Sequence, residues 1–259
     1  MKQSTFVIIL VISAAVAAFC IWQFVLGNPA NFKDGANREK PENLLGTVYV
    51  GGYVVPALIG LSIMVITFII ERTLSLKKAR GRGQLATFLK NLQRSLATGD
   101  VDAAIQACDQ QRGSMANIIR AGLERFQVMK SDSKGIEAEK QMLEIQRAIE
   151  EATALEMPIL ERNLIAMSTI ASVATMLGLF GTVIGMIRSF RALAQAGAPD
   201  AIALSIGISE ALINTALGIF AAIIGIVAYN FFVNKVDNFT YMIDEASYDV
   251  IQTLTTRVK

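Results

Sequence analysis

The sequence predicts an all-α polytopic membrane protein whose long helices extend into a cytosolic helical bundle. Hydrophobic residues make up 53% of the 259 residues and the mean hydropathy is +0.46, which is too apolar for an ordinary soluble domain. Four long apolar segments stand out, and a helix needs roughly 20 residues to cross a bilayer core of about 30 Å. Three segments meet this length directly, and the second is at the short end. The alternating pattern of a membrane β-barrel is absent.

The first apolar segment, residues 5–26 within a predicted domain 1–27, is interpreted as an N-terminal transmembrane helix. It is longer than the core of a secretory signal, which has about 7–15 residues, and it ends near Trp22, a residue suited to a membrane interface. A cleaved signal is the alternative, because the middle of the segment is rich in alanine. Residues 28–52 are predicted to form a periplasmic loop.

The second span, residues 53–71, fixes the predicted orientation. Basic residues gather directly after it: Arg72, Lys77, Lys78, Arg80 and Arg82. Such clusters favour the cytoplasmic side and contact phospholipid headgroups, so membrane lipids are expected partners. The N- and C-termini are then predicted in the cytoplasm as well. Arg188 and Arg191 oppose this orientation, because they fall on the outer side of the membrane.

Residues 72–163 are predicted to form a cytosolic helical domain. Short amphipathic helices follow one another, and Gly99-Asp100 supplies a helix stop and a new N-cap. A later helix begins at Ser114, and a polar break follows at residues 131–135. From there apolar residues recur at three- and four-residue steps toward the third span: Met142, Ile145, Ile149, Ala152 and Leu155. These stripes predict packing against other helices.

Residues 164–233 are predicted to form a hairpin of two transmembrane helices that lines a pore. On a helical wheel, small and hydroxylated residues of the third span share one side, whereas Ile and Leu occupy the other. This side carries Ser168, Ser172, Thr175, Gly178, Thr182, Gly185 and Ser189. Gly181 at its edge, together with Gly185, lets another helix approach closely. Helix packing alone and a pore-lining face are both open interpretations of this stripe.

Glu210 favours the pore, because it places a carboxylic acid inside the fourth apolar run. It lies nine residues into the run, about 13 Å along a helix, and a charged acid at that depth costs roughly 2.5–3.5 kcal/mol. Such residues face a bundle interior or a water-filled cavity and mark ion pathways. Asn214 follows one turn later on the same face, and Thr215 adds a hydroxyl. The alternative is a hydrogen bond that fixes the assembly of subunits.

The last segment, residues 234–259, is predicted to be a cytosolic C-terminal helix. The fourth apolar run is too long for the membrane alone, so the helix is expected to project into the cytosol. Its apolar residues are spaced by three and four positions, like the seam of a helix packed against other helices: Val236, Phe239, Ile243, Ala246 and Val250.

Composition excludes several classes of function. The formal net charge of +2 gives no argument for nucleic-acid binding. The absence of histidine removes the commonest general base and metal ligand, and Cys20 and Cys108 alone make no zinc site. No phosphate-binding loop of the P-loop type is present. We therefore expect no cofactor, no metal and no enzymatic activity.

The two paired motifs resemble the MotA/TolQ/ExbB proton-channel family, on the TolQ/ExbB side. They are the stretch from Gly178 to Met186 and the sequence Glu210-Ala-Leu-Ile-Asn-Thr215-Ala-Leu-Gly218. The resemblance implies a pentamer in the bacterial inner membrane around two single-span partners of the ExbD/TolR type. It also implies that a partner aspartate receives the proton and that work passes to a TonB- or TolA-like protein.

By position, Thr182 and Thr215 match the family's pore-lining threonines, and Glu210 matches its intramembrane acid. The sequence departs from the family by an additional N-terminal span and by Ala174-Thr175, where Ala-Pro is common. A flagellar or gliding stator of the MotA type is the nearest alternative, although stator subunits usually lack an acid at the position of Glu210. A membrane scaffold without ion conduction is a further alternative. A secondary transporter is less favoured, because no internal repeat is visible.

Overall fold

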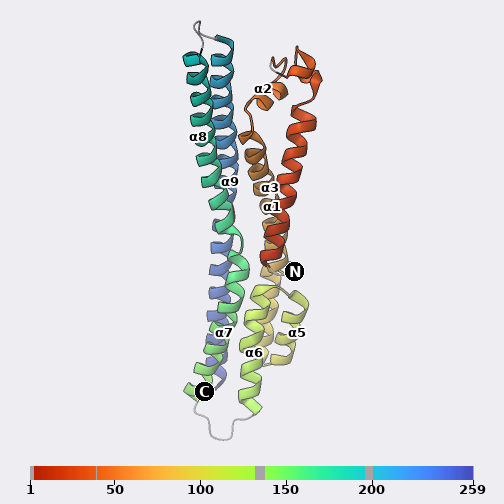
Figure 1. Cartoon of the computed structure of the whole chain (residues 1–259). Coiled ribbons are helices and arrows are strands. Elements are labelled where there is room, and N and C mark those ends of the chain that lie inside the picture. Colours follow the sequence, from red (N-terminus) through yellow and green to blue (C-terminus); the bar gives the residue numbers. More distant parts are fainter. Residues whose placement is uncertain (1–2, 39, 132–137, 196–200, 259) are drawn as a thin grey trace. The chain divides into compact units, whose positions relative to one another are not determined.

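The structure is a computed structural model that describes residues 3–38, 40–131, 138–195 and 201–258, which form an all-α protein (Figure 1). No β-strand forms within these ranges, where an isolated bridge pairs Phe32 with Pro41. Four described segments are long and apolar enough to cross a membrane: Val7–Leu26, Val54–Ala79, Glu139–Ala194 and Ala201–Thr256. The predicted fold class is therefore confirmed. A polar break is predicted at residues 131–135. Of these residues the structure describes Ser131 alone, so the rest of the break lies outside the described residues.

The chain divides into two compact units. The first unit contains residues 1–70 and 163–230, and the second contains residues 71–162 and 231–259. Helices α3 (Val54–Ala79) and α9 (Ala201–Val258) contribute residues to both units, so each part is described with its own unit. The candidate site lies wholly in the first unit.

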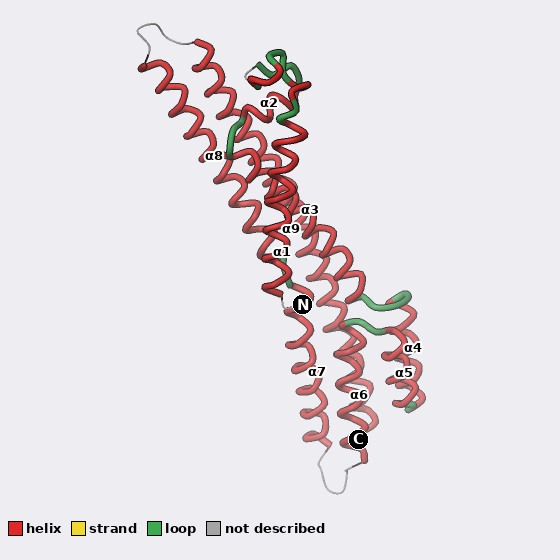
Figure 2. The backbone as a smooth tube through the Cα atoms, turned by 45° about the vertical axis from the view of Figure 1, so that its right-hand side comes forward, coloured by secondary structure: helices red, strands yellow, loops and turns green. Residues whose placement is uncertain are grey.

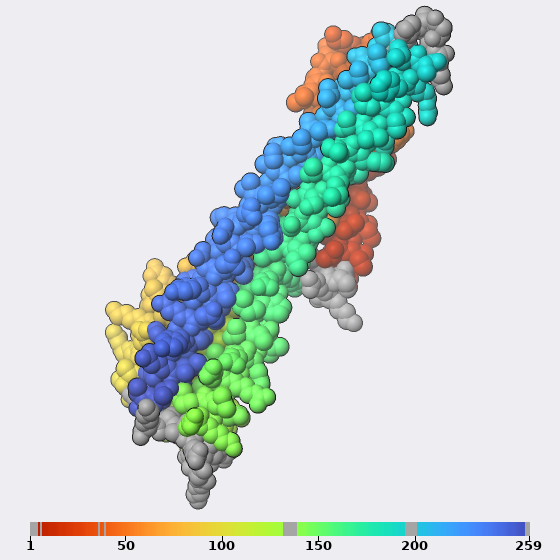
Figure 3. Space-filling model, turned by 90° about the vertical axis from the view of Figure 1, so that its left-hand side faces the viewer, coloured from red at the N-terminus to blue at the C-terminus, as the bar shows by residue number. Residues whose placement is uncertain are grey.

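In the first unit, α8 (Leu164–Gln195) and α9 form an antiparallel hairpin, and Figure 3 shows them packed side by side. Helix α1 (Gln3–Cys20) continues into η1, a π-helical segment (Ile21–Leu26). One stripe of α1 and η1 is buried at a spacing of four residues: Leu10, Ala14, Ala18, Trp22 and Leu26. Trp22 and Leu26 form a hydrophobic cluster with Val55, which docks η1 against the start of α3.

The segment predicted as a periplasmic loop contains short helices, namely η2 (Pro29–Asn31), η3 (Gly35–Asn37) and α2 (Leu44–Val50). Asn31 closes the end of η1, because its Nδ2 donates to the carbonyls of Val25 at 2.8 Å and Leu26 at 3.0 Å. Tyr49 of α2 stacks on Trp22, with ring centroids 4.8 Å apart. These contacts give the segment a defined conformation and hold the α2–α3 turn in place.

The second unit is a helical bundle of α4 (Leu85–Thr98), α5 (Val101–Gln111), α6 (Ser114–Ser131) and α7 (Ala138–Glu161), with the ends of α3 and α9 (Figure 2). The predicted stop and cap are confirmed. Gly99 adopts the left-handed conformation with φ +85°, and the Asp100 carboxylate accepts from the Ala103 N–H at 2.9 Å.

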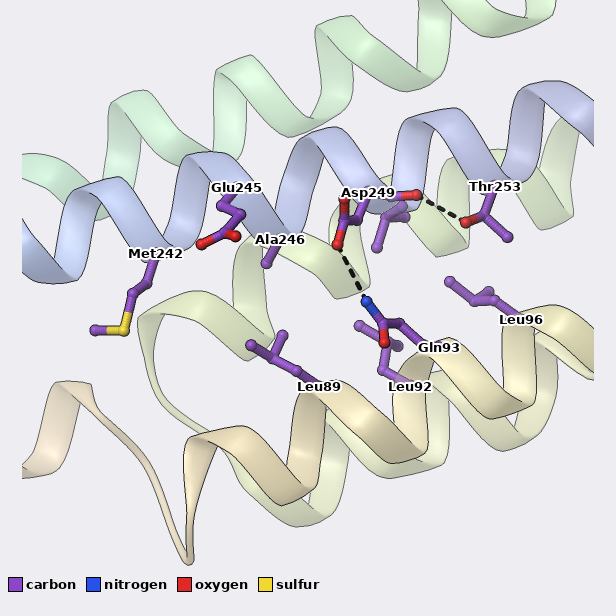
Figure 4. Close-up of a pocket in the computed structure, with 10 residues that line it drawn as sticks. Leu89, Leu92, Gln93, Leu96, Met242, Glu245, Ala246, Asp249 and Thr253 are labelled. Atoms are coloured by element: carbon purple, nitrogen blue, oxygen red, sulfur yellow. Dashed lines mark hydrogen bonds between the residues drawn. The ribbon is translucent and has the colours of Figure 1, made fainter.

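The apolar seam predicted for the C-terminal part of α9 is also confirmed, since all five of its residues are buried. Figure 4 shows Leu89, Leu92 and Leu96 of α4 beside this part of α9. Gln93 Nε2 donates to the Asp249 carboxylate at 3.1 Å across the same contact. The α7 stripe is partly wrong, because Ile145 and Ile149 are buried whereas Leu155 is 75% exposed. Six helical residues turn the side chain about 120° away from Ile149, so Leu155 leaves the buried face.

Candidate functional site

Glycines set the close approach of α8 and α9. A Cβ added at Gly178 would lie 2.9 Å from the Asn214 carbonyl oxygen, and one at Gly218 would lie 2.7 Å from the Ala174 carbonyl oxygen. A Cβ at Gly181 would lie 2.5 Å from the Asn214 Cβ. Side chains at these positions would therefore separate the helices, as expected for small-residue contacts in membranes.

Gly185 extends this contact toward the α8–α9 connection. A Cβ at Gly185 would lie 2.7 Å from both the Ala211 nitrogen and the Gly207 carbonyl oxygen. The edge of the predicted stripe thus faces α9 of the same chain. Its glycines act in packing within the hairpin, and they bring polar groups of the two helices into contact.

Thr182 and Thr215 meet where the two helices are held close, and their hydroxyl oxygens contact each other directly. Thr182 Oγ1 also lies 3.2 Å from the Gly178 carbonyl oxygen, and Thr215 Oγ1 lies 3.2 Å from the Ala211 carbonyl oxygen. Each hydroxyl can donate one proton and can accept through its lone pairs. The pair can therefore form a hydrogen bond between the two helices in either direction. Both side chains are half-buried.

Glu210 lies on a different side of α9 from Thr215 and forms an ion pair with Arg188 of α8. Arg188 Nη1 lies 2.7 Å from one carboxylate oxygen and 2.8 Å from the other. The Glu210 side chain is 4% exposed, whereas that of Arg188 is 48% exposed. Sequence reasoning missed Arg188 as a site residue. The signal in the sequence was that Arg188 and Glu210, two opposite charges, lie near the same end of the predicted hairpin.

Asn214 lies one turn after Glu210 and is fully buried. Its Nδ2 donates to the Gly51 carbonyl oxygen at 2.9 Å, which joins α9 to the turn between α2 and α3. Its Oδ1 is buried and has no hydrogen-bond partner among the described residues. Asn214 therefore anchors the turn beside Glu210.

The remaining predicted residues, Ser172 and Thr175, lie nearer the start of α8. Both are exposed, and their hydroxyls bond to carbonyls of their own helix, at 3.1 Å to Ser168 and 3.2 Å to Ala171. The structure thus brings Thr182 to Thr215 and Glu210 to Arg188, and it leaves Ser172 and Thr175 apart from both pairs. Among the residues that the structure describes, no group of three or more acidic or cysteine side chains could hold a metal ion.

The residues of the candidate site lie in a region that matches a known protein family. The model of the MotA/TolQ/ExbB proton channel family matches residues 110–245. This range includes all of α8 and the part of α9 that carries Glu210, Asn214 and Thr215. Both polar pairs of the hairpin therefore lie in the matched region.

Individual relatives agree with this match. The chain is 39% identical over 115 residues to the Tol-Pal system protein TolQ of Pseudomonas aeruginosa, which covers 44% of the chain and 49% of that protein. It is 32% identical over 185 residues to the ExbB-like 3 protein of Synechocystis, covering 70% of the chain and 81% of that protein. Identity to the biopolymer transport protein ExbB of Neisseria meningitidis is 25% over 204 residues. Less than two thirds of the Pseudomonas protein's own length is matched.

Proposed function

Because the chain belongs to the MotA/TolQ/ExbB proton channel family, we propose that it is a proton-channel subunit of an ExbB/TolQ-type inner-membrane motor. In this proposal the proton gradient drives work on a TonB- or TolA-like protein and so energises transport at the outer membrane. The voltage part of the gradient supplies about 2.3 kcal/mol per charge for each 100 mV.

The observation that carries the proposal is the burial of Glu210 inside an apolar helix, in a hairpin that also holds a pair of contacting hydroxyls. A charged side chain is costly in a membrane span and is typical of ion and proton pathways. Thr182 and Thr215 add hydrogen-bonding groups to the same hairpin, five residues along α9 from Glu210. Glu210, Asn214, Thr182 and Thr215 are therefore our candidates for the pathway.

The proposed motor is an assembly, because the described part of one chain leaves some hydroxyl groups of the span exposed. Ser172 and Thr175 are exposed on α8, where another subunit or a partner helix can reach them. We propose a homopentamer around an ExbD/TolR-like dimer of single-span proteins. The assembly is surrounded by membrane lipids, and both termini lie in the cytoplasm.

A TolQ/ExbB role is favoured over a MotA-like flagellar or gliding stator. The relatives described above carry the names TolQ and ExbB. The intramembrane acid at Glu210 points the same way, since stator subunits usually lack it. The aspartate of the single-span partner would exchange protons with the pathway.

The proposal is tested first by composition of the native complex. The complex is extracted in mild detergent from its own membranes and weighed by native mass spectrometry. We expect five copies of this chain with two copies of a small single-span protein. A monomer without partners would contradict the motor and favour a scaffold.

The same complex, reconstituted in vesicles, then tests the pathway. Thr182→Ala and Thr215→Ala are expected to assemble normally but to lower the proton flux by roughly tenfold or more, since 1.4 kcal/mol in a barrier is a factor of ten. Thr169→Ala is the matched control, because Thr169 is exposed on α8 and its hydroxyl bonds to the Ile165 carbonyl of its own helix, at 2.8 Å. Unchanged flux in both pathway variants would overturn the role of the hydroxyl pair.

A further inference from the structure

The Glu210 carboxylate is enclosed from two sides. On one side the Arg188 guanidinium contacts both carboxylate oxygens through the same nitrogen, at 2.7 and 2.8 Å. The positive charge therefore lies directly against both oxygens while the pair persists. Arg188 is about half exposed, so the cation forms the boundary between the buried acid and its surroundings.

On the other side the turn between α2 and α3 covers the carboxylate. Gly52 has a φ of +78°, which favours glycine, and a Cβ added there would lie 2.5 Å from Glu210 Oε1. The same Cβ would lie 3.5 Å from Arg188 Nη1. The hydrogen bond from Asn214 to the Gly51 carbonyl holds the turn at this position. The acid is thus closed in by backbone that leaves no room for a side chain.

The ion pair with Glu210 explains why a cation is present at position 188. A cation on the outer side of a membrane hairpin opposes the orientation that the other basic residues favour. When it is paired with Glu210, the two charges neutralise each other inside the hairpin, and a buried acid without a partner would be strongly disfavoured. The pair therefore accounts for both charges together.

We propose that Arg188 is the positioning residue for Glu210: it holds the carboxylate beneath the Gly51–Gly52 turn, and Glu210 exchanges a proton only when Arg188 moves away. The inference rests on the proposed function, in which Glu210 belongs to the proton pathway. When Arg188 swings out, the freed carboxylate accepts a proton and becomes a neutral acid. When the acid releases that proton, the ion pair forms again.

Chemical labelling of Glu210 tests this without any assay of transport. Dicyclohexylcarbodiimide is an apolar reagent that adds to carboxyl groups that carry a proton and are accessible. Native membranes that contain the full complex are treated with it, and modification of Glu210 is followed by mass spectrometry. Slow labelling is expected in the wild type, with a rate at least tenfold higher in Arg188→Gln.

Two comparison variants separate positioning from a general structural role. Arg188→Lys keeps the cation and is expected to return labelling to within a few fold of the wild type. Arg191→Gln removes an exposed charge one turn further along α8 and is expected to change nothing. Equal labelling of the wild type and Arg188→Gln would overturn the proposal, and so would a failure of Arg188→Lys to restore the slow rate.

If the Arg188→Gln protein does not accumulate in the membrane, a variant in the α2–α3 turn tests the same enclosure of Glu210. Gly52→Ala places a methyl group against the carboxylate and is expected to raise Glu210 labelling severalfold. Gly35→Ala is its control, because Gly35 has a φ of +58° but an added Cβ would meet nothing within 4 Å. Equal labelling in these two variants would count against the enclosure.

The outcomes also keep this inference distinct from the proposed function. If labelling depends on Arg188 but the threonine variants conduct normally, the enclosure holds and the hydroxyl pathway fails. If the threonine variants lose proton flux while labelling ignores Arg188, the pathway holds and the positioning role fails.

Discussion

At the scale of single residues, Arg72 differs from the basic run in which it stands. The sequence groups it with Lys77 and Lys78 as a headgroup contact and orientation signal. In the structure its side chain is fully buried, and it donates to both oxygens of Glu71 and to the Leu160 carbonyl at 3.2 Å. Lys77 and Lys78 are exposed. Arg72 therefore stabilises the second unit, which the local sequence cannot reveal because Leu160 is distant along the chain.

Cys108 allows a prediction about pH. Burial, and to a smaller extent the neighbouring Asp109 carboxylate, raises the pKa of this thiol to about 12. Alkylation requires the thiolate, so, once Cys20 is removed, Cys108 in the folded protein is expected to react with iodoacetamide at pH 8 at least about a hundredfold more slowly than in the unfolded protein. In a Cys20→Ser background, the folded rate should still climb between pH 9 and 11, whereas the unfolded rate levels off. A plateau near pH 9 in the folded protein would contradict the raised pKa.

At the scale of elements, periodicity predicts helices well and contacts between them poorly. The stripe of the C-terminal part of α9 is buried as predicted, because a stripe depends only on the period of its own helix. The hairpin register depends on two helices at once. Once Thr182 faces Thr215, six residues along α8 and five back along α9 bring Arg188 opposite Glu210. Without knowledge of that register, Arg188 is only a positive charge that opposes the predicted membrane orientation.

The close contact of α8 and α9 is tested by a glycine-to-alanine substitution at Gly218, with the same substitution at Gly60 as the control. Gly218→Ala places its Cβ against the backbone of Ala174 and Gly178, and such overpacking costs about 1–3 kcal/mol. Gly60→Ala on α3 is the matched control, because its Cβ would lie 3.7 Å from the Ala18 Cβ, an ordinary contact. We expect a lower thermal unfolding midpoint for Gly218→Ala alone, measured in one detergent. Similar midpoints would contradict a packing limit at Gly218.

At the scale of the whole molecule, composition already separates a membrane part from a polar part. The first unit exposes large apolar side chains on α1, α8 and α9, for example Ile12, Val16, Phe180 and Phe220. These suit a bilayer or a neighbouring subunit. The second unit carries ion pairs on its surface, such as Arg120 with Asp109 and Glu124. The short helices of residues 28–52 were missed, because their stability comes from Asn31 and from aromatic contacts rather than from a periodic pattern.

The predicted orientation can be measured on intact cells. In a Cys20→Ala/Cys108→Ala background, a cysteine is placed at exposed Lys33 or at exposed Glu150. A maleimide that cannot cross the inner membrane should label Lys33→Cys in intact cells. It should label Glu150→Cys roughly tenfold less until the membrane is opened, because charged groups cross the bilayer poorly. Labelling of Glu150→Cys alone in intact cells would reverse the orientation.

The aromatic cluster at η1 gives the protein an optical property. Trp22 is the only tryptophan in the chain, it is 7% exposed, and it lies within 6.0 Å of the rings of Phe19, Tyr49 and Tyr53. All indole emission therefore comes from the place where η1 meets α2, next to the turn that covers Glu210. A red shift of that emission would report water entering this junction, so an unmodified chain carries its own fluorescent probe of the N-terminal helix.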